Sequence, residues 1–245
     1  MLGRLKVERR WQWSASGKHP VAKDFFAIGA DFPLARAFSE WVGRGYDALA
    51  PLGRSGSTHA LWRFWTREAR KDHVVCGILR DSRDALGRRY PLLIMGSGPL
   101  PDWDKNWDLV PYAYENVWAQ MECLSTKSVA DLTTLGTEIQ EIKPPGADWG
   151  ALLTQRKHFD DAFLAGLGER LHRLSEADPF LCLDGQPYDA LDLAGICHHA
   201  SREEAKSPPN TVFMGGTGQH TYFAVFRRAL STSDFATLWS VDQRQ

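Results

Sequence analysis

The fold is decided by the apolar run His73-Val-Val-Cys-Gly-Ile-Leu79, the turn-rich segment Asp81-Ser-Arg-Asp-Ala-Leu-Gly87, and a second apolar run, Tyr90-Pro-Leu-Leu-Ile-Met95. Both apolar runs are nearly continuous, which is typical of strands that are covered on both faces. A short connection between two strands favours an antiparallel hairpin. The sequence therefore predicts that this hairpin belongs to the central sheet of the protein.

Further strands are predicted on both sides of this hairpin. They lie at residues 11–14, 61–65, 180–183, 211–214 and 219–226. Gly215-Gly-Thr-Gly218 separates the last two and is typical of a hairpin turn, in which glycine accepts a positive φ. Because strands occur near both ends of the chain, we expect the terminal segments to share one sheet.

Helices are predicted where apolar residues recur at helical spacing. These segments are residues 31–49, 109–124, 127–141, 159–174, 190–197 and 231–239. Ser231 followed by Asp234 resembles a capping box at the start of the last one. We therefore expect one α+β domain over residues 1–245, with a largely antiparallel central sheet, a helical middle at 104–175, and a C-terminal hairpin and helix at 180–240.

Composition restricts the function of the chain. Lys and Arg total 29 and Asp and Glu total 30, so the formal net charge is −1. The chain therefore lacks the excess of basic residues that is typical of nucleic-acid-binding proteins. No apolar run reaches the ~18 residues of a membrane span, and the N-terminus lacks the apolar core of a signal peptide. The four Cys form no CxxC pair, which favours buried, reduced thiols. We therefore expect a cytoplasmic protein without direct membrane insertion.

No motif for catalysis or metal binding is present. The sequence has neither the nucleophile elbow GxSxG nor the phosphate loop GxxxxGK[ST]. In Cys197-His198-His199, neighbouring helical side chains point about 100° apart, so the two imidazoles are poorly placed to hold one ion. We interpret these histidines as surface or helix-end residues, and expect no metal, no cofactor and no catalytic residue.

Trp103 and Trp107 are candidate interface residues. They are the only apolar side chains in Asp102-Trp-Asp-Lys-Asn-Trp-Asp108, whose alternate polar residues argue against a core strand. In one interpretation the segment is a loop whose exposed Trp side chains bind a partner. In the other, both Trp side chains fold back onto the hydrophobic end of the next helix.

Five blocks of sequence resemble the TagF/ImpM family, which is associated with bacterial type VI secretion. The first is Gly17-Lys-His-Pro-Val-Ala-Lys-Asp24-Phe25, with the pattern G-K-x-P-x-x-x-D-F. Trp62-Arg-Phe64, Cys76-Gly-Ile-Leu79, Asp81-Ser-Arg-Asp84 and Gly87-Arg-Arg-Tyr-Pro-Leu92 follow in the family order, so the resemblance is specific over residues 17–95. The motif residues are Gly17, Lys18, Pro20, Asp24, Phe25, Trp62, Arg63, Phe64, Ser82, Asp84, Gly87, Arg88, Tyr90 and Pro91.

The motif residues also have a structural interpretation. Gly17 and Pro20 shape a loop in which Asp24 accepts hydrogen bonds from backbone N–H groups. Asp84 and Arg88 flank a turn, and we expect them to pair across it. These are mostly scaffold roles, although the polar loop residues together are also a candidate surface for a partner.

The resemblance implies an accessory protein that represses the secretion machinery after translation by binding, notably to a forkhead-associated scaffold protein. It supplies no catalytic residues. Two alternatives remain open at this stage. One is a phosphoester hydrolase that uses Asp and His side chains of the loops, and the other is a structural subunit of the apparatus.

Overall fold

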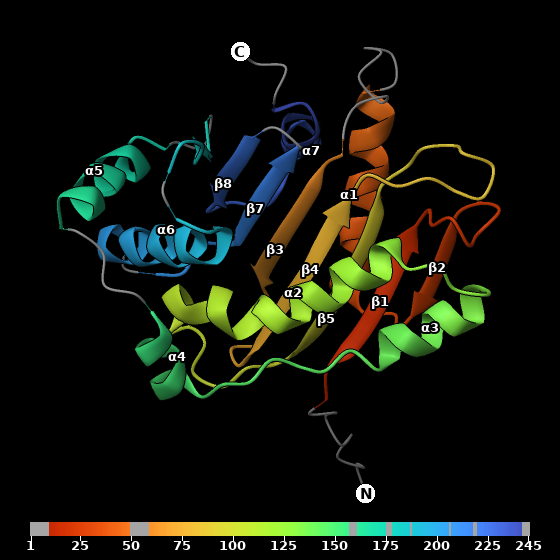
Figure 1. The fold of residues 1–245 in the computed structure, drawn as a ribbon, viewed down its shortest axis with the longest axis horizontal. Helices are drawn as coiled ribbons and strands as arrows, with labels where there is room; N and C mark the ends of the chain where they lie inside the picture. The colour runs from red at the N-terminus through yellow and green to blue at the C-terminus, as the bar shows by residue number, and fades with distance from the viewer. Residues whose placement is uncertain are drawn as a thin grey trace, which may run out of the picture.

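One eight-stranded sheet organises the protein (Figure 1). The computed structural model describes residues 10–49, 59–156, 161–174, 178–186, 188–205, 207–217 and 220–241. The strand order is β2-β1-β5-β4-β3-β7-β8-β6, and each neighbouring pair is antiparallel. The strands are β1 (Gln12–Gly17), β2 (Phe26–Gly29), β3 (Leu61–Arg67), β4 (His73–Arg80), β5 (Leu92–Pro99), β6 (Phe180–Cys182), β7 (Thr211–Thr217) and β8 (His220–Phe226).

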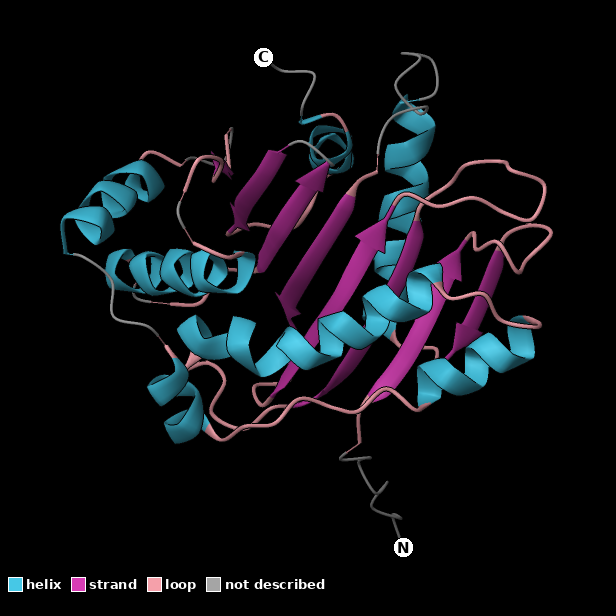
Figure 2. Ribbon diagram, viewed as in Figure 1, coloured by secondary structure: helices cyan, strands magenta, loops and turns pink. Residues whose placement is uncertain are grey.

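Helices cover both faces of the sheet (Figure 2). They are α1 (Pro33–Leu49), the short 3-10 helix η3 (Trp107–Leu109), α2 (Val110–Thr126), α3 (Leu132–Gln140), α4 (Trp149–Gln155), α5 (Asp161–His172), α6 (Ala190–Glu204) and α7 (Thr232–Trp239). α1 and α7 pack on one face, and α2, α3 and α6 lie over the other. The sheet is therefore the middle layer, with one hydrophobic core on each side.

The central hairpin shows why the two apolar runs are so continuous. β4 pairs with β5 from His73 opposite Pro99 to Arg80 opposite Leu92. Along β4, Val74, Cys76 and Ile78 face the α2 side, whereas Val75 and Leu79 face the α1 side. Because both faces are buried, apolar residues are required at successive positions rather than at alternate ones. The predicted hairpin and the single α+β domain are confirmed.

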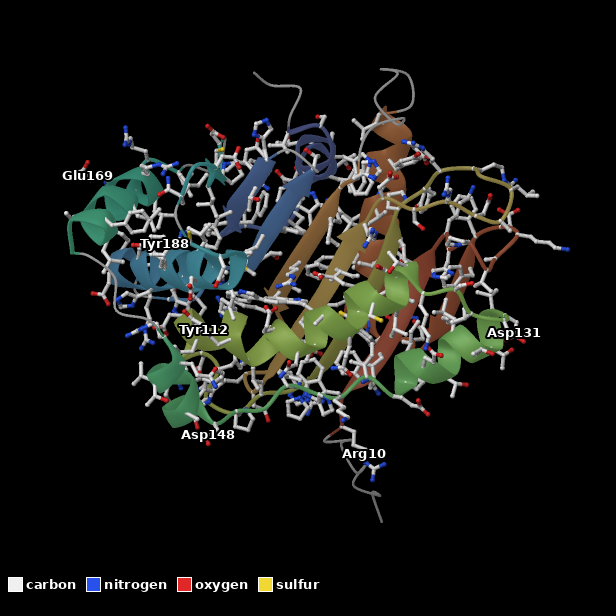
Figure 3. The ribbon with its side chains drawn as sticks, in the orientation of Figure 1. Arg10, Tyr112, Asp131, Asp148, Glu169 and Tyr188 are labelled. Atoms are coloured by element: carbon white, nitrogen blue, oxygen red, sulfur yellow. The ribbon has the colours of Figure 1, made fainter. Side chains whose placement is uncertain are left out.

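Local signals place the helix ends. Asp131 and Asp148, labelled in Figure 3, accept hydrogen bonds from the N–H groups of Thr134 and Ala151 and so cap α3 and α4. At α7 the predicted capping box is present, because Ser231 and Asp234 exchange side-chain and backbone hydrogen bonds. Within the described residues, no helix combines the length and apolar character that crossing a membrane requires.

Several predicted details need correction. β2 and α4 were not predicted, because each is too short to show a clear hydrophobic period. β7 and β8 form the predicted hairpin, but β7 extends through Thr217, and the rest of the predicted turn lies outside the described residues. The same holds for residues 159–160, where a helix start was predicted. Of the cysteines, Cys76 and Cys197 are buried and free as expected, whereas Cys123 is exposed.

Candidate functional site

Most of the motif residues meet in two adjacent loops at one end of the sheet (Figure 1). We call residues 17–25, which follow β1, and residues 81–91, which join β4 to β5, the motif loops. They are joined by a backbone hydrogen bond of 2.7 Å from the Ala85 N–H to the Ala22 carbonyl. Because β1 and β5 are paired, segments that are far apart in sequence are held together at this edge.

Asp84 is the centre of the motif loops. Its side chain is fully buried, and its Oδ2 accepts a hydrogen bond from Lys18 Nζ at 3.0 Å and another from Arg88 Nε at 2.7 Å. Its Oδ1 accepts the N–H groups of Leu86 and Arg88, both at 2.9 Å. The predicted pairing of Asp84 with Arg88 is confirmed, whereas the burial of Lys18 against Asp84 was not predicted.

The surroundings of Asp84 favour its ionised form. Burial by itself raises the pKa of this carboxyl, but the hydrogen bonds from Lys18, Arg88 and Leu86 outweigh burial and lower the pKa to about 2. Arg88 also reaches the first motif loop, where it donates to the Lys23 carbonyl at 2.7 Å and lies 3.4 Å from Asp24 Oδ1. Asp24 accepts the Phe25 N–H at 2.8 Å, as predicted. The polar motif residues thus hold the two loops together.

Glycine is required where the two loops meet. Gly17 has a φ of +116°, and a Cβ at this position would lie 2.0 Å from the carbonyl oxygen of Pro91. A larger residue is therefore excluded both by the backbone conformation and by the close approach of the second loop. This contact explains why Gly17 and Pro91 belong to the same sequence motif.

The motif loops leave two large apolar side chains in solvent. Phe25 is 59% exposed and Leu86 is 68% exposed. Lys18 Nζ lies 4.7 Å from the centroid of the Phe25 ring, and the Tyr90 ring packs against it at nearly a right angle with a centroid distance of 4.6 Å. Leu86 lies two residues after the buried Asp84. We call Phe25 and Leu86 the apolar pair.

A second group of motif residues lies on β3, away from the apolar pair. Trp62 and Phe64 are fully buried against the α1 side of the sheet. Arg63 points to the other face, where its Nε donates to Glu122 at 2.5 Å and its Nη1 donates to Glu115 at 2.8 Å. Together with the nearby Trp118 ring, these groups line a cavity of about 230 Å³ between α2 and the start of α6. The motif residues therefore fall into two groups, one in the motif loops and one on β3.

The interface interpretation of Trp103 and Trp107 is not supported by their placement. Trp103 is 3% exposed and Trp107 is 2% exposed, and both contact the ring of Trp65 on the sheet. The Trp103 indole N–H donates to the Lys71 carbonyl at 3.1 Å. The segment does form a turn before η3, but its Trp side chains face inward, as in the second interpretation. Asp102 and Lys105 of the segment are exposed, whereas Asp108 is buried with the two Trp side chains.

His198 is a core residue, which corrects the prediction of a surface histidine. Its Nε2 accepts the Trp65 indole N–H at 2.8 Å, and its Nδ1 donates to the Ala194 carbonyl at 2.7 Å. Both ring nitrogens are therefore used by the neutral imidazole. His199 points elsewhere, toward a partly exposed cluster that sequence reasoning missed, in which the buried Asp108 pairs with Arg156 and Arg202. These residues come from distant segments, so no local pattern could reveal the cluster.

Acid is expected to destabilise the protein through His198. Burial lowers the pKa of His198 from 6.5 to about 4, so between these values the unfolded chain binds a proton that the folded protein does not. Stability from this group is complete above pH 6.5 and is lost as the pH falls toward 4, by about 3 kcal/mol in total. Chemical denaturation across this pH range measures the loss.

Two matched variants isolate the effect of His198. His198→Gln keeps a donor and an acceptor but has no titrating group, so its stability is expected to fall less steeply with acid. His199→Gln makes the same change one residue away and measures the effect of replacing a neighbouring histidine. Equal slopes for His198→Gln and the wild type would contradict the lowered pKa of His198, because they would show that folding does not change its proton binding.

The sequence of the chain matches a known protein family. The model of the TagF N-terminal domain, described as type VI secretion system-associated, matches residues 14–143, which is more than half of the chain and includes both motif loops. The chain belongs to the TagF family. No curated protein sequence matches it. The matched part of this TagF-family chain also contains α1, α2 and α3.

The fold is also similar to a solved structure. The crystal structure of PA0076 from Pseudomonas aeruginosa PAO1 aligns with a TM-score of 0.53 and 17% sequence identity, covering 93% of each chain. At this identity the likeness concerns the fold alone. The similarity of fold is not limited to residues 14–143. It also covers helices and strands of the C-terminal part of the TagF-family chain. Within the described residues, no group of three His, Cys, Asp or Glu side chains is placed to hold a metal ion.

Proposed function

We propose that this TagF-family chain is a non-enzymatic cytoplasmic protein that restrains a type VI secretion apparatus after translation by binding one of its components. The forkhead-associated scaffold protein of the same system is the proposed partner. The observation that supports this role is the apolar pair, Phe25 and Leu86, which is exposed on loops that are tied together by a buried ion pair. Rigid loops with exposed apolar anchors are typical of recognition surfaces, because little conformational entropy is lost on binding.

The polar groups of the motif loops favour binding over hydrolysis. Asp84 and His19 are two candidate general bases of these loops. A third is Asp81, whose pKa is raised by burial and whose Oδ2 lies 3.9 Å from Arg89 Nη1. Asp84 has four donors and a pKa of about 2, which makes it a weak base. His19 is 1% exposed, and its ring contacts the Leu124 carbonyl and the Val21 N–H. Asp84 and His19 are both engaged in holding the loops, so we favour the binder over the phosphoester hydrolase.

Replacing the apolar pair with serine tests the proposed function. In Phe25→Ser/Leu86→Ser, affinity for the purified scaffold protein is expected to fall by about tenfold or more, because apolar anchors dominate binding energy. Secretion by cells that carry this variant is expected to rise, since the restraint is weakened. Binding is measured by calorimetry, and secretion by the amount of a secreted component in the medium.

The control uses the other large hydrophobic side chain that is exposed among the described residues. Leu153 on α4 is 51% exposed, and Leu153→Ser is expected to change neither affinity nor secretion. All variants are expected to melt within about 2 °C of the wild type, since exposed side chains contribute little to stability. An apolar-pair variant that binds and represses normally would contradict the proposal. Co-sedimentation of the chain with the assembled apparatus in fixed proportion would favour the structural-subunit alternative instead.

A further inference from the structure

The motif loops are more basic than the rest of the chain. They contain five basic residues and three acidic ones, which are Lys18, Lys23, Arg83, Arg88, Arg89, Asp24, Asp81 and Asp84, so their net charge is +2 in a chain whose net charge is −1. Asp47 of α1 also acts on Tyr90 at the border of the loops and reduces the local excess to +1. The motif loops are therefore positively charged although the chain as a whole is negatively charged.

The excess charge lies on exposed side chains. Lys18 and Asp84 are buried and cancel each other. Arg88 and Arg89 keep 49% of their side chains exposed, and each has a carboxylate nearby, Asp24 and Asp81 respectively.

Lys23 and Arg83 are two further exposed cations, and we call them, together with Arg88 and Arg89, the basic rim. In the described part of the chain neither Lys23 nor Arg83 makes an ion pair with a carboxylate. Lys23 precedes Phe25 by two residues, and Arg83 precedes Leu86 by three. Lys18 Nζ lies 4.7 Å from the Phe25 ring centroid. The exposed cations and the apolar pair therefore share the same two loops.

We infer that the partner of this surface presents an acidic face, with carboxylates that surround an apolar patch which covers Phe25 and Leu86. This inference rests on the proposed function and adds the chemistry of the partner. Apolar contacts at the centre supply most of the affinity, and complementary charges at the rim raise the association rate and select the partner. Asp24 and Asp81 beside the cations favour a protein face over an anionic lipid surface, because a protein can place a basic group opposite each of them whereas anionic lipids repel both.

Charge reversal tests the inference separately from the proposed function. In Lys23→Glu/Arg83→Glu, affinity for the purified scaffold protein is expected to fall by about tenfold at low ionic strength, mainly through a slower association rate. The wild-type affinity is expected to weaken as salt is added, and this dependence is expected to be smaller in the variant. Surface plasmon resonance over a range of salt concentrations measures both effects.

A matched charge reversal provides the control. Arg70 and Lys71 lie exposed in the turn before β4, at the opposite end of that strand from the motif loops. Arg70→Glu/Lys71→Glu changes the net charge by the same amount and is expected to leave binding and its salt dependence unchanged. Equal loss in both variants would mean that total charge, and not this rim, controls association.

The remaining outcomes separate the two proposals. If Phe25→Ser/Leu86→Ser loses binding while Lys23→Glu/Arg83→Glu keeps it, the acidic partner face is wrong and the proposed function stands. If the scaffold protein does not bind the unaltered chain, both are wrong. Binding of the chain to phosphatidylglycerol vesicles that is lost in Lys23→Glu/Arg83→Glu would overturn the inference in favour of a membrane surface.

Discussion

Trp103→Ala and Trp107→Ala are each expected to lower the free energy of unfolding by about 3–5 kcal/mol, because each removes a large buried aromatic side chain and leaves a cavity. Both rings are almost fully buried in the core between the sheet and α2. Trp103→Ala also leaves the Lys71 carbonyl without its indole donor. Urea denaturation measures the change as a shift of the midpoint with an unchanged slope.

The same two variants separate a core role from an interface role. We expect the surviving folded fraction to bind its partner with wild-type affinity, since neither ring reaches the surface. Lys105→Ala is a suitable control, because it lies between the two Trp residues and its ammonium pairs with Asp102 at the exposed surface. It is expected to leave the urea midpoint nearly unchanged, because exposed ion pairs contribute little to stability. Loss of affinity without loss of stability in the Trp variants would show that both residues belong to an interface.

Asp84→Asn is expected to lower the melting temperature by roughly 10 °C, because it leaves the buried ammonium of Lys18 without its carboxylate. The motif loops are expected to loosen as a result, and the position of Phe25 with them, since Lys18 lies over the Phe25 ring. Affinity for the partner is therefore expected to weaken together with stability. Differential scanning calorimetry gives the melting temperature, and hydrogen exchange of the loop amides reports the loosening.

The pH dependence of this effect has a definite sign. Folding lowers the pKa of Asp84 from 3.8 to about 2, so its contribution to stability is complete above pH 3.8 and is lost as the pH falls toward 2. The difference between the wild type and Asp84→Asn is expected to shrink over the same range. Asp102→Asn, which breaks the exposed pair with Lys105, is expected to shift the melting temperature by no more than about 2 °C. Equal effects of the two Asn variants would show that Asp84 is not a buried anchor.

Hydrophobic patterning was sufficient to predict the architecture. Residues 73–79 of β4 and 92–95 of β5 are mostly apolar at successive positions because both faces of these strands are covered. That pattern indicates a central strand without knowledge of its neighbours, although the predicted strand began at residue 90, two residues before β5. Turn and cap residues are equally local signals, which is why the capping box at Ser231 was predicted correctly. The short strand β2 carries no comparable signal, because it has only four residues and lies at the edge of the sheet.

The candidate site required the tertiary structure. The motif residues could be recognised in sequence, but the burial of Lys18 on Asp84 depends on the pairing of β1 with β5, which are separated by more than seventy residues. The sequence alone also could not place Trp103 and Trp107, since in a polar segment two Trp side chains can face either solvent or the core. Only the position of Trp65 on the sheet places both rings in the core.

The sequence by itself thus determined the α+β class, the central antiparallel hairpin and the TagF resemblance, because these depend on periodicity, turn chemistry and motif order along the chain. The tertiary structure alone decided which motif residues are buried anchors and which are exposed. Asp84 and Leu86 are two residues apart, yet one is enclosed by four donors and the other is largely in solvent. Exposure of a loop side chain depends on the elements that pack against the loop, and those contacts come from distant parts of the chain.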